Sequence, residues 1–198
     1  MIPLASPPAV LAAAPENQEL AVAPLVLAFA SDPTARWMYP HAHQFRTFFP
    51  RFVRVFAGQA FALGTAHYIE GFHATSLWLP PGVIPDGAAM APLVQETVAP
   101  DRRGDLFAML AQMVTCHPAK AHWYLPLFGV DARYQRRGYG SALLTPMLAS
   151  FDREQATAYL DCTSPDNLPF FERHGFSVCG EIQSGTSPTL FGMLREPR

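Results

Sequence analysis

The sequence has few charged residues and no long apolar run. Charged residues make up 15% of the 198 residues and hydrophobic residues 49%, a balance typical of a globular chain and not of a disordered one. The formal net charge of −2 gives no reason to expect a nucleic acid partner. No apolar stretch reaches the ~18 residues that a membrane span requires. We therefore expect a single domain over residues 1–198, with neither nucleic acid nor membrane as a partner.

Cysteines are also scarce. Cys116, Cys162 and Cys179 show no CxxC spacing and leave an odd count, which is typical of reduced thiols in a cytoplasmic protein. No His/Cys group has zinc-like spacing, so we expect no structural metal. The apolar run from Met1 to Ala14 has no Lys or Arg before it, and three prolines interrupt it. We therefore do not expect a signal peptide.

The first half of the chain is predicted to form helices on both sides of a β-hairpin. A short strand is expected at Ala9–Ala14 and a helix through Leu25 to Phe29, with Pro24 in its first turn. Phenylalanines at helical spacing predict an amphipathic helix at Gln44–Ala57, kinked at Pro50. The remaining predicted elements are strands at Phe61–Tyr68 and Phe72–Leu79 around the turn Glu70-Gly71, and a weaker helical pattern over 86–115.

The second half alternates strands with helices. The predicted elements are a strand at His122–Val130, a helix at Ser141–Asp152, a strand at Thr157–Cys162, a short helix at Leu168–His174, and strands at Phe176–Ile182 and Leu190–Leu194. Strand–helix–strand alternation implies a parallel pair joined by a right-handed crossover. The hairpins on both sides imply antiparallel neighbours, so the fold class is α/β with a mixed sheet.

Two glycines and a group of arginines occur where a strand gives way to a helix. Gly138 and Gly140 let the backbone approach a ligand closely and adopt positive φ. The unpaired N–H groups of the first helical turn and the helix dipole suit a pyrophosphate. Arg136 and Arg137 would add charge-assisted hydrogen bonds, and Arg133 belongs to the same basic patch. Because many such turns bind nothing, spacing alone leaves open both an anion site and a purely structural turn.

Two segments carry a family likeness. Gln135 to Gly140, with the letters QRRGYG, is similar to the Q/R-x-x-G-x-G/A signature of the Gcn5-related N-acetyltransferases (GNAT). The preceding Leu127 to Asp131 looks like the fourth strand of that family. Asn167 to Phe176, with the letters NLPFFERHGF, resembles its N-x-x-F-Y-E-R-x-G-F segment. The likeness extends from about Pro8 to Pro197, and Ala28 to Pro33 looks particularly like the puromycin N-acetyltransferase branch.

The resemblance implies a fold and a cosubstrate. The GNAT fold has a twisted, mixed but mostly antiparallel sheet of six or seven strands, flanked by helices, whose fourth and fifth strands splay apart around acetyl-CoA. Pro126 fits this expectation, because proline is tolerated where strand pairing is lost. By the same resemblance, the residues that bind acetyl-CoA would be Phe128, Val130, Gln135, Arg136, Arg137, Gly138, Tyr139, Gly140, Ser141, Asn167 and Phe171.

The usual proton donor of the family is missing. GNAT enzymes commonly protonate the leaving thiolate with the Tyr of F-Y-E-R, and this chain has Phe171 there. Either the CoA thiolate needs no strong acid, since thiol pKa values lie near ~8.5, or another group substitutes, or the protein binds acyl-CoA without efficient catalysis. The substitutes considered are Tyr139, Tyr124, Cys162 and His174.

A general base is expected on the strand Thr157–Cys162. If Leu160 faces the core, Asp161 and Tyr159 share the opposite face of the strand, and Asp161 is the candidate base. The alternative is that Asp161 is a structural carboxylate that caps or pairs near a loop. Other titratable residues that could line the acceptor site are His41, His43, His67, Glu70 and His73, each equally consistent with an ordinary structural position. Aromatic residues that could do so are Trp37, Tyr39, Trp78 and phenylalanines of the 44–57 helix.

These observations predict an N-acetyltransferase that moves the acetyl group of acetyl-CoA directly to a primary amine of a small molecule, with no metal. Scarce acidic residues over 31–60 favour a hydrophobic or aromatic amine over a polyamine. Two alternatives remain: a non-catalytic acyl-CoA sensor of the same fold, and an acetyltransferase for a protein lysine or N-terminus. The resemblance also raises the possibility of a homodimer through the C-terminal strands.

Overall fold

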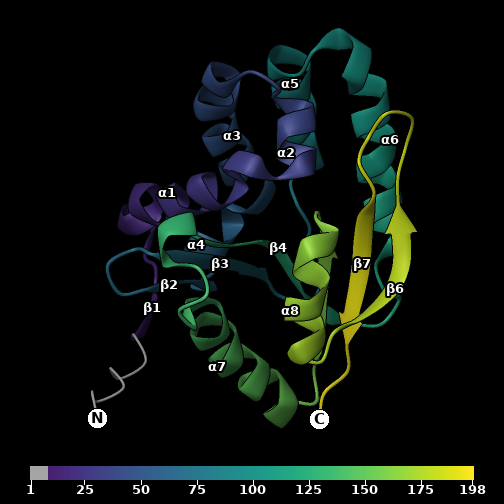
Figure 1. Ribbon diagram of the computed structural model, residues 1–198. Coiled ribbons are helices and arrows are strands. Elements are labelled where there is room, and N and C mark those ends of the chain that lie inside the picture. The colour runs from purple at the N-terminus through teal and green to yellow at the C-terminus, as the bar shows by residue number, and fades with distance from the viewer. Residues whose placement is uncertain (1–8) are drawn as a thin grey trace.

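The computed structural model describes residues 9–198 (Figure 1). Residues 1–8, where the apolar run discussed above begins, lie outside the described residues. The first half comprises β1 (Val10–Ala12), α1 (Gln18–Ala28), α2 (Pro33–Met38), α3 (Ala42–Ala57), α4 (Gln59–Ala62), β2 (Ala66–Ile69), β3 (Ala74–Leu79), α5 (Gly87–Thr97) and α6 (Pro100–Cys116). The second half comprises β4 (His122–Val130), α7 (Tyr139–Arg153), β5 (Thr157–Cys162), α8 (Leu168–Arg173), β6 (Ser177–Ile182) and β7 (Leu190–Arg195).

The seven strands form one sheet in the order β1-β2-β3-β4-β5-β7-β6. The β4–β5 pair is parallel, as the helix α7 between these two strands requires. The other neighbouring pairs are antiparallel. The predicted mixed, mostly antiparallel sheet flanked by helices is therefore confirmed, and β6 and β1 are its edge strands.

Strands β4 and β5 separate halfway along β4. Their pairing runs from His122↔Thr157 to Leu125↔Leu160 and stops there, although β4 continues to Val130 and stays paired with β3 up to Ala74↔Val130. The residue that follows the last pair is Pro126, which has no N–H to donate to β5. This end of the ladder leaves the backbone of the second half of β4 free on the side that faces β5.

Each face of the sheet is covered by its own set of helices. Alternation along β5 sends Tyr159 into the core formed with α1, α3 and α6, and sends Leu160 into the core formed with α7 and α8. In Figure 1, α7 lies below strands β2 to β4, while α1 to α3 lie above them. The splay between β4 and β5 thus opens between two separately packed layers.

Two predicted elements differ from the structure. Pro24 lies inside α1 and not in its first turn; the carbonyl of Leu20, which would have received its hydrogen bond, belongs to a residue that is 55% exposed, so water can reach it. Phe61 belongs to the helical turn α4, and the strand predicted from Phe61 begins at Ala66. A short apolar run has no periodicity that separates a buried strand from a buried helix.

Candidate active site

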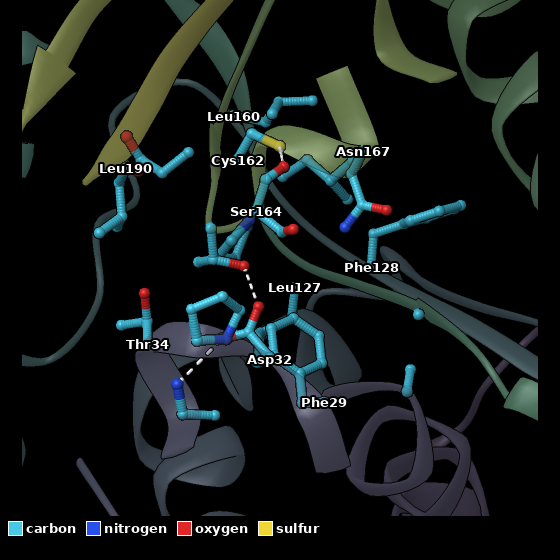
Figure 2. Close-up of a pocket in the computed structure, with 18 of the residues that line it drawn as sticks. Phe29, Asp32, Thr34, Leu127, Phe128, Leu160, Cys162, Ser164, Asn167 and Leu190 are labelled. Carbon is cyan, nitrogen blue, oxygen red and sulfur yellow. Dashed lines mark hydrogen bonds between the residues drawn. The ribbon is translucent and has the colours of Figure 1, made fainter. Parts of the chain in front are cut away.

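A cavity of about 860 Å³ lies at the splay between β4 and β5. Its walls come from the diverging strands, from the turn before α7, from α8, and on the opposite side from the α1–α2 connection, α3 and α6. Figure 2 shows that residues from both halves of the chain converge there, with Phe29 and Asp32 facing Ser164 and Asn167. Elements that are far apart in the sequence therefore line the same cavity.

The turn before α7 is shaped to receive an anion. Arg136 has a φ of 59° and Gly138 a φ of 82°, and Gly138 is the N-cap of α7. Its first helical hydrogen bond runs from the Ala142 N–H to the Gly138 carbonyl, 2.9 Å. Among residues 9–198, the N–H groups of Tyr139, Gly140 and Ser141 find no acceptor. Three unpaired amides and the positive end of the helix dipole thus point out of the protein.

The backbone conformation at position 138 requires glycine, and the space around this residue is open. A Cβ on Gly138 would meet nothing within 4 Å, but the positive φ strains any L side chain. The free volume outside the unpaired amides suits a diphosphate. The residues of this turn therefore fit the pyrophosphate of CoA.

The arginines of the predicted basic patch have different partners. Arg136 lines the cavity. The guanidinium of Arg137 lies 5.6 Å from the centre of the Tyr134 ring. Arg133 instead pairs with the buried carboxylate of Asp131, with 2.7 Å between Nη2 and Oδ2. The prediction that Arg133 belongs to the basic patch is therefore corrected, because the charge of Arg133 is already paired with that of Asp131.

The second half of β4 offers backbone groups to a ligand. Phe128 and Val130 line the cavity beyond the point where pairing with β5 stops. The Gln135 side chain donates from Nε2 to the Val130 carbonyl, 3.1 Å, so Gln135 ties the turn to the strand. Asn167, which is exposed at the start of α8, lines the opposite wall, and Figure 2 shows its amide beside Phe128.

Aromatic rings fill the centre of the cleft. The rings of Phe128 and Phe170 stack with centroids 5.6 Å apart. A Cβ on Gly140 would come within 3.1 Å of the Phe170 ring, so glycine permits this close packing. Phe171, where the GNAT signature has tyrosine, is 7% exposed and packs against Phe128 and Phe176. Neither ring on α8 can donate a proton to a leaving group.

Asp161 is a buried carboxylate held by two tyrosines. The hydroxyl of Tyr124 donates to Oδ2 (2.8 Å) and that of Tyr159 donates to Oδ1 (2.9 Å). Its side chain is 3% exposed, and the residue lines the cavity. Burial raises the pKa of Asp161 to about 6, although the two hydroxyls oppose the shift. The expectation that Asp161 and Tyr159 share a face of β5 is confirmed.

Tyr124 contacts Asp161 and lies away from the cleft surface. It is 3% exposed, and burial, followed by the charge of Asp161, raises its pKa well above the ordinary tyrosine value. Such a phenol stays protonated and serves as a hydrogen-bond donor to Asp161. The geometry supports a role for Tyr124 in holding the carboxylate and gives it no contact with the phenylalanines at the centre of the cleft.

Other sequence candidates lie elsewhere among the described residues. The Tyr139 ring packs against His73 and Tyr134, with centroids 5.9 and 5.8 Å away, and it does not line the cavity. The same holds for His41, His43, His67, Glu70, His73 and His174, and for Trp37, Tyr39 and Trp78. Burial raises the pKa of Cys162, which does line the cavity, to about 11. The Cys162 thiol therefore stays protonated and donates to the Ser164 carbonyl, 3.1 Å.

Four polar residues near the cavity escaped the sequence reasoning. Asp32 caps α2 by accepting from the Ala35 N–H (2.9 Å) and also accepts from the hydroxyl of Thr163, so it ties the α1–α2 connection to the segment after β5 (Figure 2). Burial raises the pKa of Asp32. No local pattern joins residues 131 positions apart.

The other two are His117 and His122, whose rings lie behind Asp161. The Nδ1 of His117 is 2.9 Å from the Nε2 of His122, and the Nε2 of His117 is 4.0 Å from Asp161 Oδ2. His122 alternates with Tyr124 along β4, and this spacing of two was the available sequence signal.

The wall that α3 and α6 give the cavity is apolar. Three phenylalanines of α3 (Phe49, Phe52 and Phe56) and four residues of α6 (Leu106, Met109, Leu110 and Met113) line it. Phe49 and Phe52 stack with centroids 5.9 Å apart. The helical stripe that predicted α3 therefore also lines the cavity.

Within residues 9–198, no three His, Cys, Asp or Glu side chains are grouped to hold a metal ion. No helix in that part of the chain is long and apolar enough to cross a membrane. These findings leave the cleft, its amides and its buried carboxylate as the features that call for a function.

Residues 99–176 match the model of the acetyltransferase (GNAT) family. The match covers α6, β4, the turn, α7, β5 and α8, which build one side and much of the lining of the cavity. With the seven-stranded sheet and its splay, this finding supports assignment to the GNAT superfamily. The puromycin N-acetyltransferase branch is not confirmed.

Known proteins share parts of the sequence and the whole fold. An uncharacterised N-acetyltransferase of Schizosaccharomyces pombe is 32% identical over 78 residues, which cover 38% of this chain and 32% of that protein. The chain thus matches about a third of that relative's length. A Corynebacterium glutamicum structure described as a histone acetyltransferase and related acetyltransferase has a TM-score of 0.66 at 24% identity, covering 98% of both chains. A Drosophila melanogaster polyamine N-acetyltransferase has a TM-score of 0.64 at 14% identity, covering 95% of this chain and 99% of that one.

Proposed function

We propose that this protein transfers the acetyl group of acetyl-CoA directly to a primary amine of a small molecule, with both substrates bound at once. The observation that carries the proposal is one continuous cavity with unpaired helix-start amides at one end and the buried carboxylate of Asp161 deeper inside. The family match over 99–176 supports acetyl transfer as the reaction class. A cytoplasmic location and a homodimer through the edge strand β6 stay predictions.

In this proposal acetyl-CoA binds along the splay. The amides of residues 136–141 hold the pyrophosphate, with Arg136 and Arg137 adding positive charge. The pantetheine follows the free edge of β4 between Phe128 and Val130 and passes Asn167 on the other wall. Phe128, Phe170 and Phe171 give the acyl end an apolar, water-poor surrounding, in which hydrogen bonds to the thioester are strengthened.

Asp161 takes the proton from the amine. With a pKa of about 6, its carboxyl group is mostly ionised near pH 7, and burial makes it a stronger base than an exposed aspartate. Attack requires the neutral amine, which is the minor form at pH 7 because an alkylammonium ion has a pKa near ~10; once the neutral nitrogen has attacked the thioester, its remaining protons become far more acidic. The proton therefore moves as the N–C bond forms, and Tyr124 and Tyr159 keep Asp161 in place.

The CoA sulfur leaves as a thiolate. Phe170 and Phe171 carry no proton to give, and the thiol of Cys162 has a pKa of about 11, above the ~8.5 of an ordinary thiol. Transfer from Cys162 to the departing sulfur is therefore uphill. At neutral pH water protonates a thiolate of that pKa without help from the protein.

The acceptor is an amine with an apolar body. The side chains of α3 and α6 form a hydrophobic wall opposite Asp161, and burial of apolar surface favours a ligand that matches it. Solved structures of the same fold include enzymes described as agmatine and arylalkylamine N-acetyltransferases. The apolar wall supports the arylalkylamine kind of acceptor over a polyamine.

The main alternative is a binder that senses acyl-CoA without transferring it. Phe171 favours it, because the proton donor common in the family is absent. Thiol release from acetyl-CoA, measured with a panel of aromatic amines, polyamines and lysine peptides against a sample without acceptor, separates the cases. We expect release with aromatic amines. Tight acetyl-CoA binding without release for every acceptor would establish the sensor, and release with peptides alone would establish a protein acetyltransferase.

A further inference from the structure

A chain of polar side chains leads from the active-site cavity to a second cavity. The second cavity has a volume of about 520 Å³ and is lined by the 82–87 loop, the ends of α5 and α6, and residues 117–122. Phe56, Leu110 and Met113 line both cavities and separate them. Asp161 lines the first cavity, and His117 and His122 line the second. The polar chain thus passes beside an apolar partition.

The hydrogen bonds fix which ring nitrogens carry protons. The Nδ1 of His122 lies 2.8 Å from the Lys120 carbonyl, which only accepts, so Nδ1 of His122 carries a hydrogen. In the neutral ring its Nε2 is then an acceptor and receives the Nδ1–H of His117 at 2.9 Å. The Nε2 of neutral His117 therefore carries a lone pair and no hydrogen, and it lies 4.0 Å from Asp161 Oδ2.

The environment keeps His117 neutral, so the ring can only pass a proton on to His122 in the same step and does not hold it. Burial, and then the neighbouring His122, lower the pKa of His117 to about 4, so the ring is neutral at pH 7. Its ring packs against those of Tyr124 and Tyr159, with centroids 4.5 and 4.4 Å away. Both tyrosines donate to Asp161 and have raised pKa values. They therefore cannot carry a proton away from this carboxyl group.

We infer that His117 and His122 form a proton exit that re-ionises Asp161 after each acetyl transfer, an inference that rests on the proposed function. Once His117 has closed the 4.0 Å gap to Asp161 Oδ2, the O–H bond of protonated Asp161 breaks as its proton moves to Nε2 of His117, and in the same step the Nδ1 proton of His117 moves to Nε2 of His122. His122 is then an imidazolium whose Nδ1–H is bonded to the Lys120 carbonyl, and it loses that proton to water of the second cavity after this bond opens. Rotation of the rings restores the first tautomers, and no electrons are gained or lost.

The charged and titratable groups around this exit are few. They are Lys120 before β4, His122 and Tyr124 on β4, Tyr159 and Asp161 on β5, and Cys116 and Cys179 near Tyr159. Lys120 pairs with Glu196, so its charge is balanced by a carboxylate. Neither histidine touches the substrate; both act through Asp161.

The test compares His117→Gln and His122→Ala with the control His67→Gln. His67 is also half-buried with a pKa lowered by burial, but it lies on β2 and lines neither cavity. We expect kcat of both exit variants to fall about tenfold, with unchanged acetyl-CoA affinity and a larger solvent isotope effect. Adding imidazole, which fits the second cavity, should restore most of the rate of His122→Ala and should not change the control.

Two results would overturn the exit. The first is that the wild-type enzyme acetylates amines and both exit variants keep its rate, pH profile and isotope effect. That result would contradict the exit and leave the proposed function standing. The other is independent of activity: nitrogen-15 NMR of the histidine rings at pH 7 should show Nδ1–H tautomers for both, and Nε2–H tautomers would contradict the geometry. If the protein acetylates no amine, the proposed function fails and the exit fails with it, whereas an active enzyme with unaffected histidine variants loses the exit alone.

Discussion

The two ends of the cavity achieve their chemistry in different ways. At the α7 end, backbone N–H groups and a left-handed glycine make an anion site, and the identity of most side chains there is secondary. At the other end, a single carboxylate, Asp161, depends on two tyrosines of β4 and β5 that hold it and on burial, which raises its pKa. A backbone site can be recognised in a short motif, whereas a side-chain site depends on the assembled fold.

The largest expected effect falls on the carboxylate end. Asp161→Asn keeps the shape and size of the side chain but removes the base. We expect kcat to fall by about 10²–10⁴-fold, with acetyl-CoA affinity unchanged. Steady-state rates together with calorimetric binding would check this. A variant that keeps more than a tenth of the rate would show that another group accepts the proton.

The second effect falls on the anion end. Gly138→Asp adds a strained side chain and a negative charge where the pyrophosphate is proposed to bind. We expect acetyl-CoA affinity to fall at least about 100-fold, equivalent to about 3 kcal/mol. Gly64→Asp, at an exposed glycine that also has positive φ, is the matched control for backbone strain. Equal loss in both variants would remove the electrostatic explanation.

The third effect is a dependence on pH. Since the pKa of Asp161 is raised to about 6, kcat should rise with pH and level off above about pH 7. The same raised pKa favours folding when the group is protonated, so this contribution is present below its unfolded value of 3.8 and is lost as pH passes about 6. Asp161→Asn should therefore gain melting temperature relative to wild type at pH 8, and should gain clearly less at pH 5, between the two pKa values. An equal difference at both pH values would contradict the raised pKa.

A smaller effect tests the tyrosines that hold Asp161. Each hydroxyl stabilises the ionised carboxylate, so Tyr124→Phe should raise the pKa of Asp161 further, by about one unit if one hydrogen bond is lost. The acidic limb of the pH–rate profile then moves upward by that amount, and the plateau rate changes less. An unshifted limb would show that Asp161 does not control it.

The smallest effect concerns Phe171. If the CoA thiolate leaves without a proton donor, Phe171→Tyr should change kcat by less than about threefold at pH 8, where a thiol of pKa ~8.5 is already about a quarter ionised. A large gain in kcat would show that the missing acid limits this enzyme. Melting temperature provides the control, because Phe171 is buried and a hydroxyl placed there needs a partner.

The sequence predicted much of the fold because its patterns are local. Period-two alternation located β3 to β7, the phenylalanine stripe located α3, and Pro126 marked the residue where the β4–β5 ladder ends. The turn at Gly138 was equally readable, since positive φ and a helix start are properties of adjacent residues. Phe61 failed because a short apolar run suits either a strand or a helical turn.

The carboxylate end was only partly predictable. Strand alternation placed Asp161 and Tyr159 together, but the bond from Tyr124 crosses between two strands and needs their register. The link between Asp32 and Thr163 and the histidine pair behind Asp161 depend on packing between distant segments. Such contacts leave no mark in the spacing of neighbouring residues.

The central claim is that one end of the cavity binds acetyl-CoA while the other end accepts the proton. A single-turnover experiment tests it most directly: Asp161→Asn is saturated with acetyl-CoA, mixed with an arylalkylamine at pH 7.5, and thiol release is followed in time. The account predicts wild-type affinity for acetyl-CoA and a transfer rate at least about 100-fold lower. A transfer rate equal to wild type would contradict it.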